Sequence, residues 1–437
     1  MKMNKKLLDQ AFQKIEKEIE DEELIRRKRE QLKELYLPLS KEELLDILGL
    51  TVKQDDTNKL ITFLCCLSAY TRNNQFNISF NAPSSTGKSY IPIEIASFFS
   101  KEDVIKVGYC SPTAFFHDKG TFIKDLEGYY VDLERKILIF LDQPHTLLLQ
   151  HLRPLLSHDE KEICIKITDK SQKYGLKTKK VIIRGYPSVI FCSAGLKIDE
   201  QEATRFLLLS PETTQEKIRE GILEALKKGA DPEIYFEELN NNPKRRLLIE
   251  RIKAIKEENI KKIKLHNLDK IQERFFSMHK VLKPRHQRDI KRLLSLIKSL
   301  TLLNLWYRQT EELDVILASD EDIEEGFRLW EEISFSQELN LPPYIYQVFK
   351  EVILFLYQEK QAGLTRKEIM QGYLRIYNRP VAEWQLRREI LPMLEMAGLI
   401  VQEQDPEDKR NKLIIPVYPT PQSTISKPEN NVDWTVG

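Results

Sequence analysis

The chain has 437 residues, of which 41% are hydrophobic and 31% charged, and its formal net charge is +1. The length fits two to four domains, and the hydrophobic content is sufficient for ordinary cores. The near-zero net charge excludes a protein that binds nucleic acid through its overall charge. Any contact with nucleic acid therefore needs local basic patches. The five cysteines form no C-x-x-C pair and no run of about 18 apolar residues occurs, so we expect no cysteine-based zinc site, no membrane contact and a cytoplasmic location.

The first predicted segment, residues 1–50, is helical and densely charged. Leu8, Phe12, Ile15 and Ile19 give one narrow apolar stripe. The helix that carries them either packs on its own domain or serves as an arm that binds a partner. The run Ser-Lys-Glu-Glu from Ser40 resembles a capping box and predicts the start of another helix.

Residues 51–215 alternate between strand-like and helix-like segments, which predicts an α/β nucleotide-binding domain. The strand candidates are residues 77–80, 104–107, 137–141 and 188–192. Each is a short apolar run, as expected of strands that are buried in a parallel sheet.

The first of these strands leads into a phosphate-binding loop with the sequence Ala-Pro-Ser-Ser-Thr-Gly-Lys-Ser. Its residues are Ala82, Pro83, Ser84, Ser85, Thr86, Gly87, Lys88 and Ser89. Backbone N–H groups of such a loop surround a phosphate, the lysine reaches the β- and γ-phosphates of ATP, and the last hydroxyl binds Mg²⁺. Alanine replaces the usual first glycine, which the loop accepts if φ stays negative there, and Pro92 must lie in the first turn of the helix that follows.

A second nucleotide-binding element ends the strand at residues 137–141. Asp142 follows that strand and is expected to hold the water shell of Mg²⁺ beside Ser89. The next residue is Gln143, where most hydrolytic P-loop enzymes have a glutamate that activates water. Three readings stay open: the glutamine orients the water, hydrolysis is slow and the nucleotide mainly structural, or a nearby acid acts instead, with Asp159, Glu160 and Glu162 as candidates.

Residues 163–168 and 178–183 alternate with period two and predict a β-hairpin. The tip between them is basic and contains a tyrosine; its candidate DNA contacts are Lys170, Lys173, Tyr174 and Lys177. A further buried strand follows, and after it comes Thr-Arg-Phe at residues 204–206.

This order of parts resembles the AAA+ ATPases, and among them the minichromosome-maintenance (MCM) helicases and their relatives on mobile elements. In that group a hairpin before the sensor 1 strand projects lysines into a central channel. The resemblance implies that Arg205 is an arginine finger that completes the site of a neighbouring subunit. It also makes Arg288, in Arg-Asp-Ile-Lys-Arg-Leu, the sensor 2 arginine that touches the γ-phosphate, although Arg285 and Arg292 compete for that role.

The resemblance covers roughly residues 60–335 and rests on order and spacing. Besides Ala82 and Gln143, the chain departs from the family at sensor 1, where the asparagine falls near Ala194 and Ser193 is the substitute. The family's long N-terminal oligonucleotide-binding and zinc region has no counterpart in the first 60 residues. A reduced mobile-element helicase, a loader or an initiator therefore fits better than a replicative helicase of the usual build.

Residues 216–338 are almost wholly helical in pattern and are predicted to be the helical lid. Residues 339–418 read as three helices followed by two strands, which predicts a winged helix, and 419–437 as a disordered tail. Thr365 is the expected N-cap of the second helix. The expected DNA contacts of this unit are Arg387, Arg388, Lys409 and Arg410, although winged helices also serve as protein-interaction modules.

The predicted fold is thus an α/β P-loop AAA+ core with a helical lid, a C-terminal winged helix and a short N-terminal helical segment. The predicted function is that of an ATP- and Mg²⁺-dependent DNA helicase or replication initiator that forms a homo-oligomeric ring, expected to be a hexamer. It would act on single-stranded or forked DNA, with a primase or another replication protein as a possible partner. The alternative is an ATP-bound oligomeric switch that recruits or loads such a partner with little hydrolysis.

Overall fold

The computed structural model describes residues 23–108, 120–124, 128–142, 144, 146–169, 177–193, 205–406 and 409–417. The chain divides into two compact units, Met1–Tyr344 and Ile345–Gly437, which are described separately. In the described part of the chain, every helix is too short or too polar to cross a membrane.

The larger unit is built on a five-stranded parallel sheet with the order β2-β5-β8-β1-β9. Its strands are β1 (Ile78–Asn81), β2 (Val104–Val107), β5 (Ile137–Phe140), β8 (Ser188–Ser193) and β9 (Leu207–Leu209). All except the edge strand β2 are buried throughout, as a parallel sheet covered on both faces requires. The structure therefore confirms the α/β core and the four predicted strands, and it adds β9.

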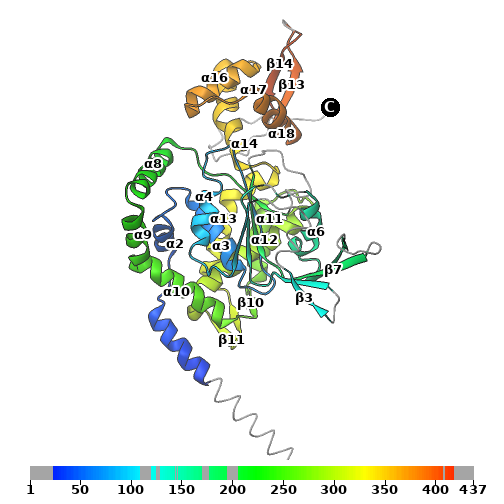
Figure 1. Ribbon diagram of the computed structural model, residues 1–437. Helices are drawn as coiled ribbons and strands as arrows, with labels where there is room; N and C mark the ends of the chain where they lie inside the picture. The colour runs from blue at the N-terminus through cyan, green and yellow to red at the C-terminus, as the bar shows by residue number, and fades with distance from the viewer. Residues whose placement is uncertain are drawn as a thin grey trace, which may run out of the picture. The chain divides into compact units, whose positions relative to one another are not determined.

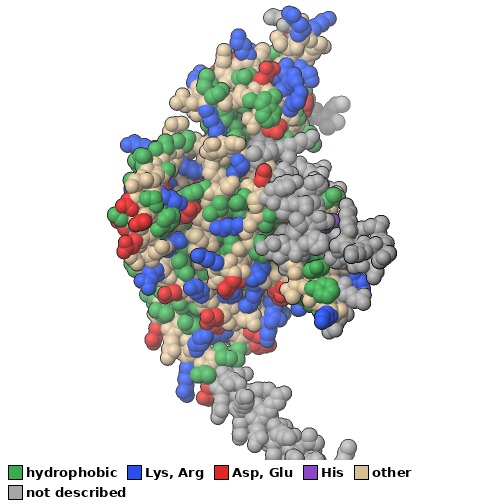
Figure 2. Space-filling view, viewed as in Figure 1, with side chains coloured by type: hydrophobic (Ala, Val, Ile, Leu, Met, Phe, Trp, Pro, Cys, Tyr) green, Lys and Arg blue, Asp and Glu red, His purple; other side chains and the backbone are tan. Residues whose placement is uncertain are grey.

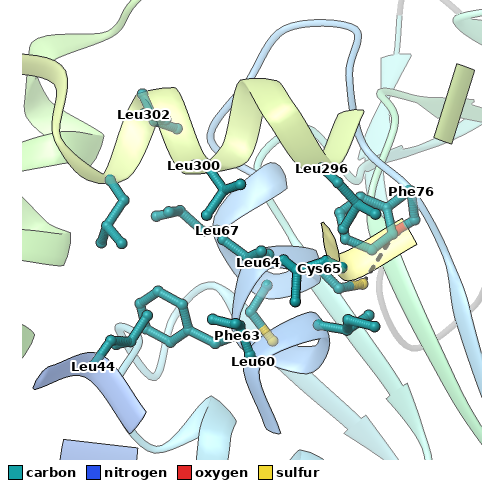
Figure 3. Packing of buried hydrophobic residues seen from close by; sticks show 14 of the residues in the cluster. Leu44, Leu60, Phe63, Leu64, Cys65, Leu67, Phe76, Leu296, Leu300 and Leu302 are labelled. Atoms are coloured by element: carbon teal, nitrogen blue, oxygen red, sulfur yellow. Dashed lines mark hydrogen bonds between the residues drawn. The ribbon is translucent and has the colours of Figure 1, made fainter. Parts of the chain in front are cut away.

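One helix of this unit is buried on every side. In α3 (Asp56–Ser68), all residues from Asn58 onward are buried, because the helix lies between the sheet and other helices. Figure 3 shows its leucines beside Leu296 and Leu300 of α12 (His286–Leu303) and Leu44 of α2 (Lys41–Leu48). The Cys65 thiol donates a hydrogen bond of 3.1 Å to the carbonyl oxygen of Phe76.

The same core includes helices from late in the chain. They are α10 (Pro243–Glu258), α11 (Leu268–Met278) and α13 (Asp320–Glu338). Helices α12 and α13 approach closely at Gly326, where a Cβ atom would lie 2.4 Å from Ile297. Gln337 of α13 binds the edge of β9 that faces away from β1. Its amide accepts from the Leu208 N–H at 2.9 Å and donates to the Leu208 carbonyl oxygen at 2.8 Å. Segments 41–68 and 243–338 thus share one core with the sheet.

Helices α8 (Gln215–Ala230) and α9 (Pro232–Asn241) form an arc with α10 along one side of this unit (Figure 1). Asp231 and Asn242 cap α9 and α10, each accepting from a backbone N–H over 3.0 Å, and each is followed by a proline at the first helical position. Several large apolar side chains of the arc are exposed: Ile218, Ile222, Leu223, Leu226, Ile234, Phe236 and Leu247.

A second sheet with the order β3-β4-β7-β6 lies on the side of the unit away from this arc (Figure 1). Its strands are β3 (Thr121–Ile123), β4 (Gly128–Asp132), β6 (Glu162–Asp169) and β7 (Lys177–Arg184), with α6 (Thr146–Leu156) packed against it. β6 and β7 are antiparallel and pair from Glu162↔Arg184 to Asp169↔Lys177, which confirms the predicted hairpin. A small third sheet contains β10 (Lys262–Lys264), β12 (Val315–Leu317) and β11 (Thr310–Glu312), and a 3-10 turn covers Leu305–Tyr307.

The smaller unit begins within α14 (Pro343–Val348). Its helical segments are Phe349–Leu354 (a π-helix), α15 (Phe355–Lys360), α16 (Arg366–Tyr377), α17 (Glu383–Gln385), Leu386–Ile390 (a second π-helix) and α18 (Leu391–Met396). Strands β13 (Ile400–Gln404) and β14 (Lys412–Pro416) are antiparallel. Thr365 caps α16 with a capping box and Ser40 caps α2 in the same way, as the sequence predicts.

Candidate nucleotide-binding site

The loop 82–89 joins the carboxyl end of β1 to α4 (Tyr90–Ala96), at the edge of the sheet where open α/β folds bind ligands. Ser85 and Gly87 have left-handed backbone conformations, with φ of 64° and 90°, whereas Ala82 does not. The condition under which alanine fits the first loop position is therefore met. Pro92 lies in the first turn of α4, also as predicted.

Two side chains of this loop fold back on it. The hydroxyl of Thr86 donates to the Pro83 carbonyl oxygen at 2.9 Å, and the Lys88 ammonium approaches the same oxygen at 3.4 Å. Ser84 and Ser85 are exposed at the outside of the loop. Within the described residues, the lysine ammonium thus makes a long hydrogen bond to a neutral oxygen of its own loop, which a phosphate group would replace at little cost.

Strand β8 lies between β1 and β5 and brings the other predicted residues to this loop. Asn81 pairs with Ser193 and Phe140 with Phe191. The backbone N–H of Ala82 points to the carbonyl oxygen of Ser193 over 3.4 Å. Asp142 follows β5 at the same edge and is exposed, while Gln143 lies outside the described residues.

Cys192 is a central residue of this site that the sequence did not single out. Its thiol donates to the Lys88 carbonyl oxygen at 3.3 Å and is hydrogen-bonded to Ser89. Burial, together with the charge of Asp142, raises the pKa of Cys192 to about 12, whereas the Ser89 hydrogen bond and the charge of Lys88 lower it. The buried thiol thus contacts the backbone of Lys88 and the side chain of Ser89, and it lies within the electrostatic influence of Lys88 and Asp142. The Ser89 hydroxyl and the Asp142 carboxylate are hard oxygen ligands of the kind that Mg²⁺ prefers.

The predicted arginines lie at the opposite, amino edge of the sheet. Arg205 and Arg288 line a cavity of about 170 Å³ together with Asn77, which precedes β1. Since a strand rises roughly 3.3 Å per residue, Asn77 and Ala82 are roughly 16 Å apart. The two arginines therefore belong to a different site from the loop 82–89 of the same chain.

This cavity is rich in cations. Besides Arg205 and Arg288, it is lined by Lys291 and Arg292, with Asp159 and His158 at its wall. The guanidinium of Arg205 donates to the Ser157 hydroxyl at 3.0 Å.

Asp289 binds two of the three arginines that compete for the sensor role. Arg285, which precedes α12, and Arg292 both donate to this buried carboxylate, at 2.8 and 2.9 Å. Arg288 and Arg292 both line the amino-edge cavity, so the sensor role of Arg288 stays a prediction.

His158 is a second residue that the sequence missed. It adopts a left-handed conformation with φ of 57° and packs edge-on against Tyr186, with ring centroids 4.5 Å apart. Burial, and then the charge of Lys291, lowers the pKa of His158 to about 4. The imidazole is therefore neutral at physiological pH, so His158 adds no positive charge to those of the arginines and the lysine that line the cavity.

The predicted DNA contacts are described only in part. Lys170, Lys173 and Tyr174 lie outside the described residues, and Lys177 is the first residue of β7. In the smaller unit, Arg387 and Arg388 are exposed on the second π-helical segment, beside Trp384, which is 57% exposed. Lys409 and Arg410 are exposed in the connection between β13 and β14.

Comparison with known proteins gives no family for this chain. No family model matches the sequence, and no curated protein matches it either. The functional argument therefore rests on the residues and their arrangement.

Proposed function

We propose that this protein is a Mg²⁺-dependent ATPase of the P-loop class that works as an AAA+-like oligomeric ring on DNA, as a helicase or replication initiator. The observation that carries the proposal is the position of the loop 82–89 and of Asp142 just after β1 and β5, at the carboxyl edge of one parallel sheet, where the Cys192 thiol contacts the Lys88 carbonyl oxygen and Ser89. This edge offers a loop with positive-φ residues, one cation and two oxygen ligands, which is what a nucleotide triphosphate with Mg²⁺ requires.

The ring is supported by the separation of the two halves of the site. Arg205 and Arg288 line a cavity at the amino edge, so they can contact a γ-phosphate only if the nucleotide belongs to another copy of the chain. A contact between two different faces of identical subunits is head-to-tail, and such contacts form a ring when the rotation between neighbouring subunits closes. On this proposal both arginines act in trans.

The surface beside the loop also supports a subunit contact. Lys228 of α8 lies 3.8 Å from Glu94 of α4, the helix that follows the loop. Nearby, α8 and α9 expose Ile222, Leu226 and Ile234, and Figure 2 shows apolar side chains along this margin. Exposed apolar clusters of this kind mark protein–protein contacts.

One observation favours the alternative function, an ATP-bound switch that recruits a replication partner. Gln143 replaces the expected catalytic carboxylate. Asp159, one of the acids considered as a substitute, lines the cavity at the amino edge and is therefore remote from the loop of its own chain. The steady-state ATPase rate with and without single-stranded DNA separates the two functions, because a motor is stimulated by DNA and a switch is not.

The hairpin gives the second test. Replacing Lys170, Lys173 and Lys177 together by alanine should weaken DNA binding and reduce its log–log salt slope by about three, one per lost phosphate contact. Basal ATP turnover should persist, while stimulation by DNA should vanish. The matched control replaces the exposed Lys106, Lys244 and Lys253, which removes the same charge elsewhere.

DNA could also bind to the smaller unit, so the same titration is repeated with Arg387 and Arg388 replaced by alanine. If the lysine triple variant binds DNA with the wild-type salt slope and only the arginine variant loses affinity, the hairpin does not contact DNA. That result would contradict the helicase function and favour the alternative, an ATP-bound switch that recruits a replication partner.

A further inference from the structure

Two histidines and a glutamate meet where three helices of the larger unit end or begin. His279 follows the last residue of α11, His286 is the first residue of α12, and Glu338 is the last residue of α13. Their potential ligand atoms all lie within 4.8 Å of one another. The histidines are 6% and 4% exposed, and their ring centroids are 4.1 Å apart.

The polar atoms of this cluster are poorly satisfied. His279 Nδ1 lies 2.6 Å from Glu338 Oε1, and His286 Nε2 lies 4.0 Å from the same oxygen. Within the described residues, neither His279 Nε2 nor His286 Nε2 has a hydrogen-bond partner, although both atoms are buried. A buried nitrogen without a partner is costly, so His286 Nε2 points to an occupant of the space that it shares with His279 Nδ1 and Glu338.

We propose that His279, His286 and Glu338 bind a divalent transition-metal ion, and that Zn²⁺ fits them best. Two imidazole nitrogens and one carboxylate oxygen form a donor set that zinc uses in proteins, with water in the fourth position. Imidazole also favours zinc over the harder Mg²⁺ and Ca²⁺, which prefer oxygen ligands alone. The site is separate from the loop 82–89 and does not depend on the proposed ATPase function.

The metal would bind through His279 Nδ1 and His286 Nε2, the nitrogens that face Glu338. Each neutral ring then carries its proton on the other nitrogen, His279 Nε2 and His286 Nδ1. One contact has to be broken: the backbone N–H of Lys283 donates to His286 Nδ1 at 3.2 Å. Lys283 Nζ lies 3.7 Å from Glu338 Oε2, whereas the oxygen near both histidines is Oε1.

The location gives such an ion a clear structural role. It would join the end of α11, the start of α12 and the end of α13. Arg285, whose guanidinium donates to the Asn340 side-chain oxygen at 2.6 Å, already links the residues beside α12 and α13. Helix α12 also carries Arg288, which lines the amino-edge cavity. A bound metal would therefore fix the part of α12 that presents this arginine.

The test uses the full chain, treated with a chelator, dialysed, and then titrated with Zn²⁺ by calorimetry and with Co²⁺ by absorption spectroscopy. Wild type should bind one equivalent that His286→Gln and Glu338→Gln do not bind. Its Tm should rise on adding Zn²⁺, and Co²⁺ should give the intense visible bands of a four-coordinate ion. His266→Gln is the matched control, because His266 pairs with Asp320 outside the cluster and should keep the full stoichiometry.

Equal metal stoichiometry in wild type and the two cluster variants, or no uptake in wild type, would overturn the proposal. If His286→Gln fails to fold, the Glu338→Gln variant decides, since that side chain is 26% exposed and its replacement keeps the same shape.

Discussion

The two edges of the central sheet carry complementary and incomplete sets of groups. Among the described residues, the carboxyl edge has the loop 82–89 with Lys88 and the oxygen-bearing side chains of Ser89 and Asp142, whereas the amino edge gathers Arg205, Arg288 and further cations around a cavity. On the proposed function, the first set would hold Mg²⁺ and a nucleotide, and the second would supply charges that stabilise a transition state. The comparison favours an arrangement in which the two halves of one site come from different copies of the chain.

The largest effect is expected at the carboxyl edge. Lys88→Ala should lower ATP turnover by about 10²-fold or more and weaken ATP binding, because the phosphate loses its only cation in the loop. Folding should be unaffected, since the Lys88 ammonium makes just a 3.4 Å contact to Pro83. Turnover, ATP affinity and Tm are measured together, with Lys106→Ala as the control; wild-type affinity in the Lys88 variant would remove the P-loop assignment.

A substitution of Arg205 tests whether the arginines of one subunit complete the nucleotide site of a neighbouring subunit. Arg205→Ala should keep ATP binding but lose about 10³-fold in turnover, as expected of an arginine that contacts the γ-phosphate. Mixing it with Lys88→Ala should restore part of the activity, because some interfaces then contain an intact loop and an intact arginine. Activity that stays absent at every mixing ratio would mean that the two edges do not cooperate in trans.

A substitution at Gln143 tests whether the missing carboxylate that would activate water is what limits ATP hydrolysis. Gln143→Glu should raise turnover by about 10²-fold if the missing carboxylate limits hydrolysis. The measurement is kcat at saturating ATP, with Gln143→Ala for comparison. A fall in kcat for the glutamate variant would instead show that the glutamine already orients the attacking water.

The smallest effect concerns the charge of the amino edge. His158 has a folded-state pKa of about 4, below the usual value near 6.5, so the unfolded chain binds a proton first as the pH falls. The stability that the neutral ring contributes is fully present above pH 6.5 and is lost on going down toward pH 4. At pH 5 the loss is about 2 kcal/mol.

His158→Asn should therefore make the free energy of unfolding depend less on pH between 7 and 5, as measured by urea denaturation at both values. Asparagine tolerates the left-handed backbone at this position, so the substitution itself adds little strain. If the free energy of unfolding depends on pH equally in the variant and in wild type, protonation of the His158 imidazole does not destabilise the fold.

Local patterns in the sequence predicted much of this structure. The loop 82–89, the hairpin and the capping boxes at Ser40 and Thr365 are each specified within a few residues, so composition and periodicity were enough to find them. The strand order was not accessible, because no local signal says that β8 lies between β1 and β5. Strand β9 was missed because three leucines after a Phe are too short a run to assign.

The sites were predicted unevenly for the same reason. Lys88, Ser89 and Asp142 belong to recognisable motifs, whereas Cys192 and His158 acquire their surroundings only when distant segments meet. The sequence likewise could not show that Arg205 and Arg288 line the same cavity, because the two residues are far apart along the chain and meet only after folding.

The amide of Gln337 has a consequence for how copies of this chain can associate. By making both hydrogen bonds to Leu208, it acts as a one-residue substitute for a sixth strand. An unpaired strand edge is a template for adding a strand from another molecule, and the centre of this one is already hydrogen-bonded. A strand from a second copy could pair with β9 only by breaking both hydrogen bonds of Gln337, so we expect copies to associate through side-chain surfaces instead.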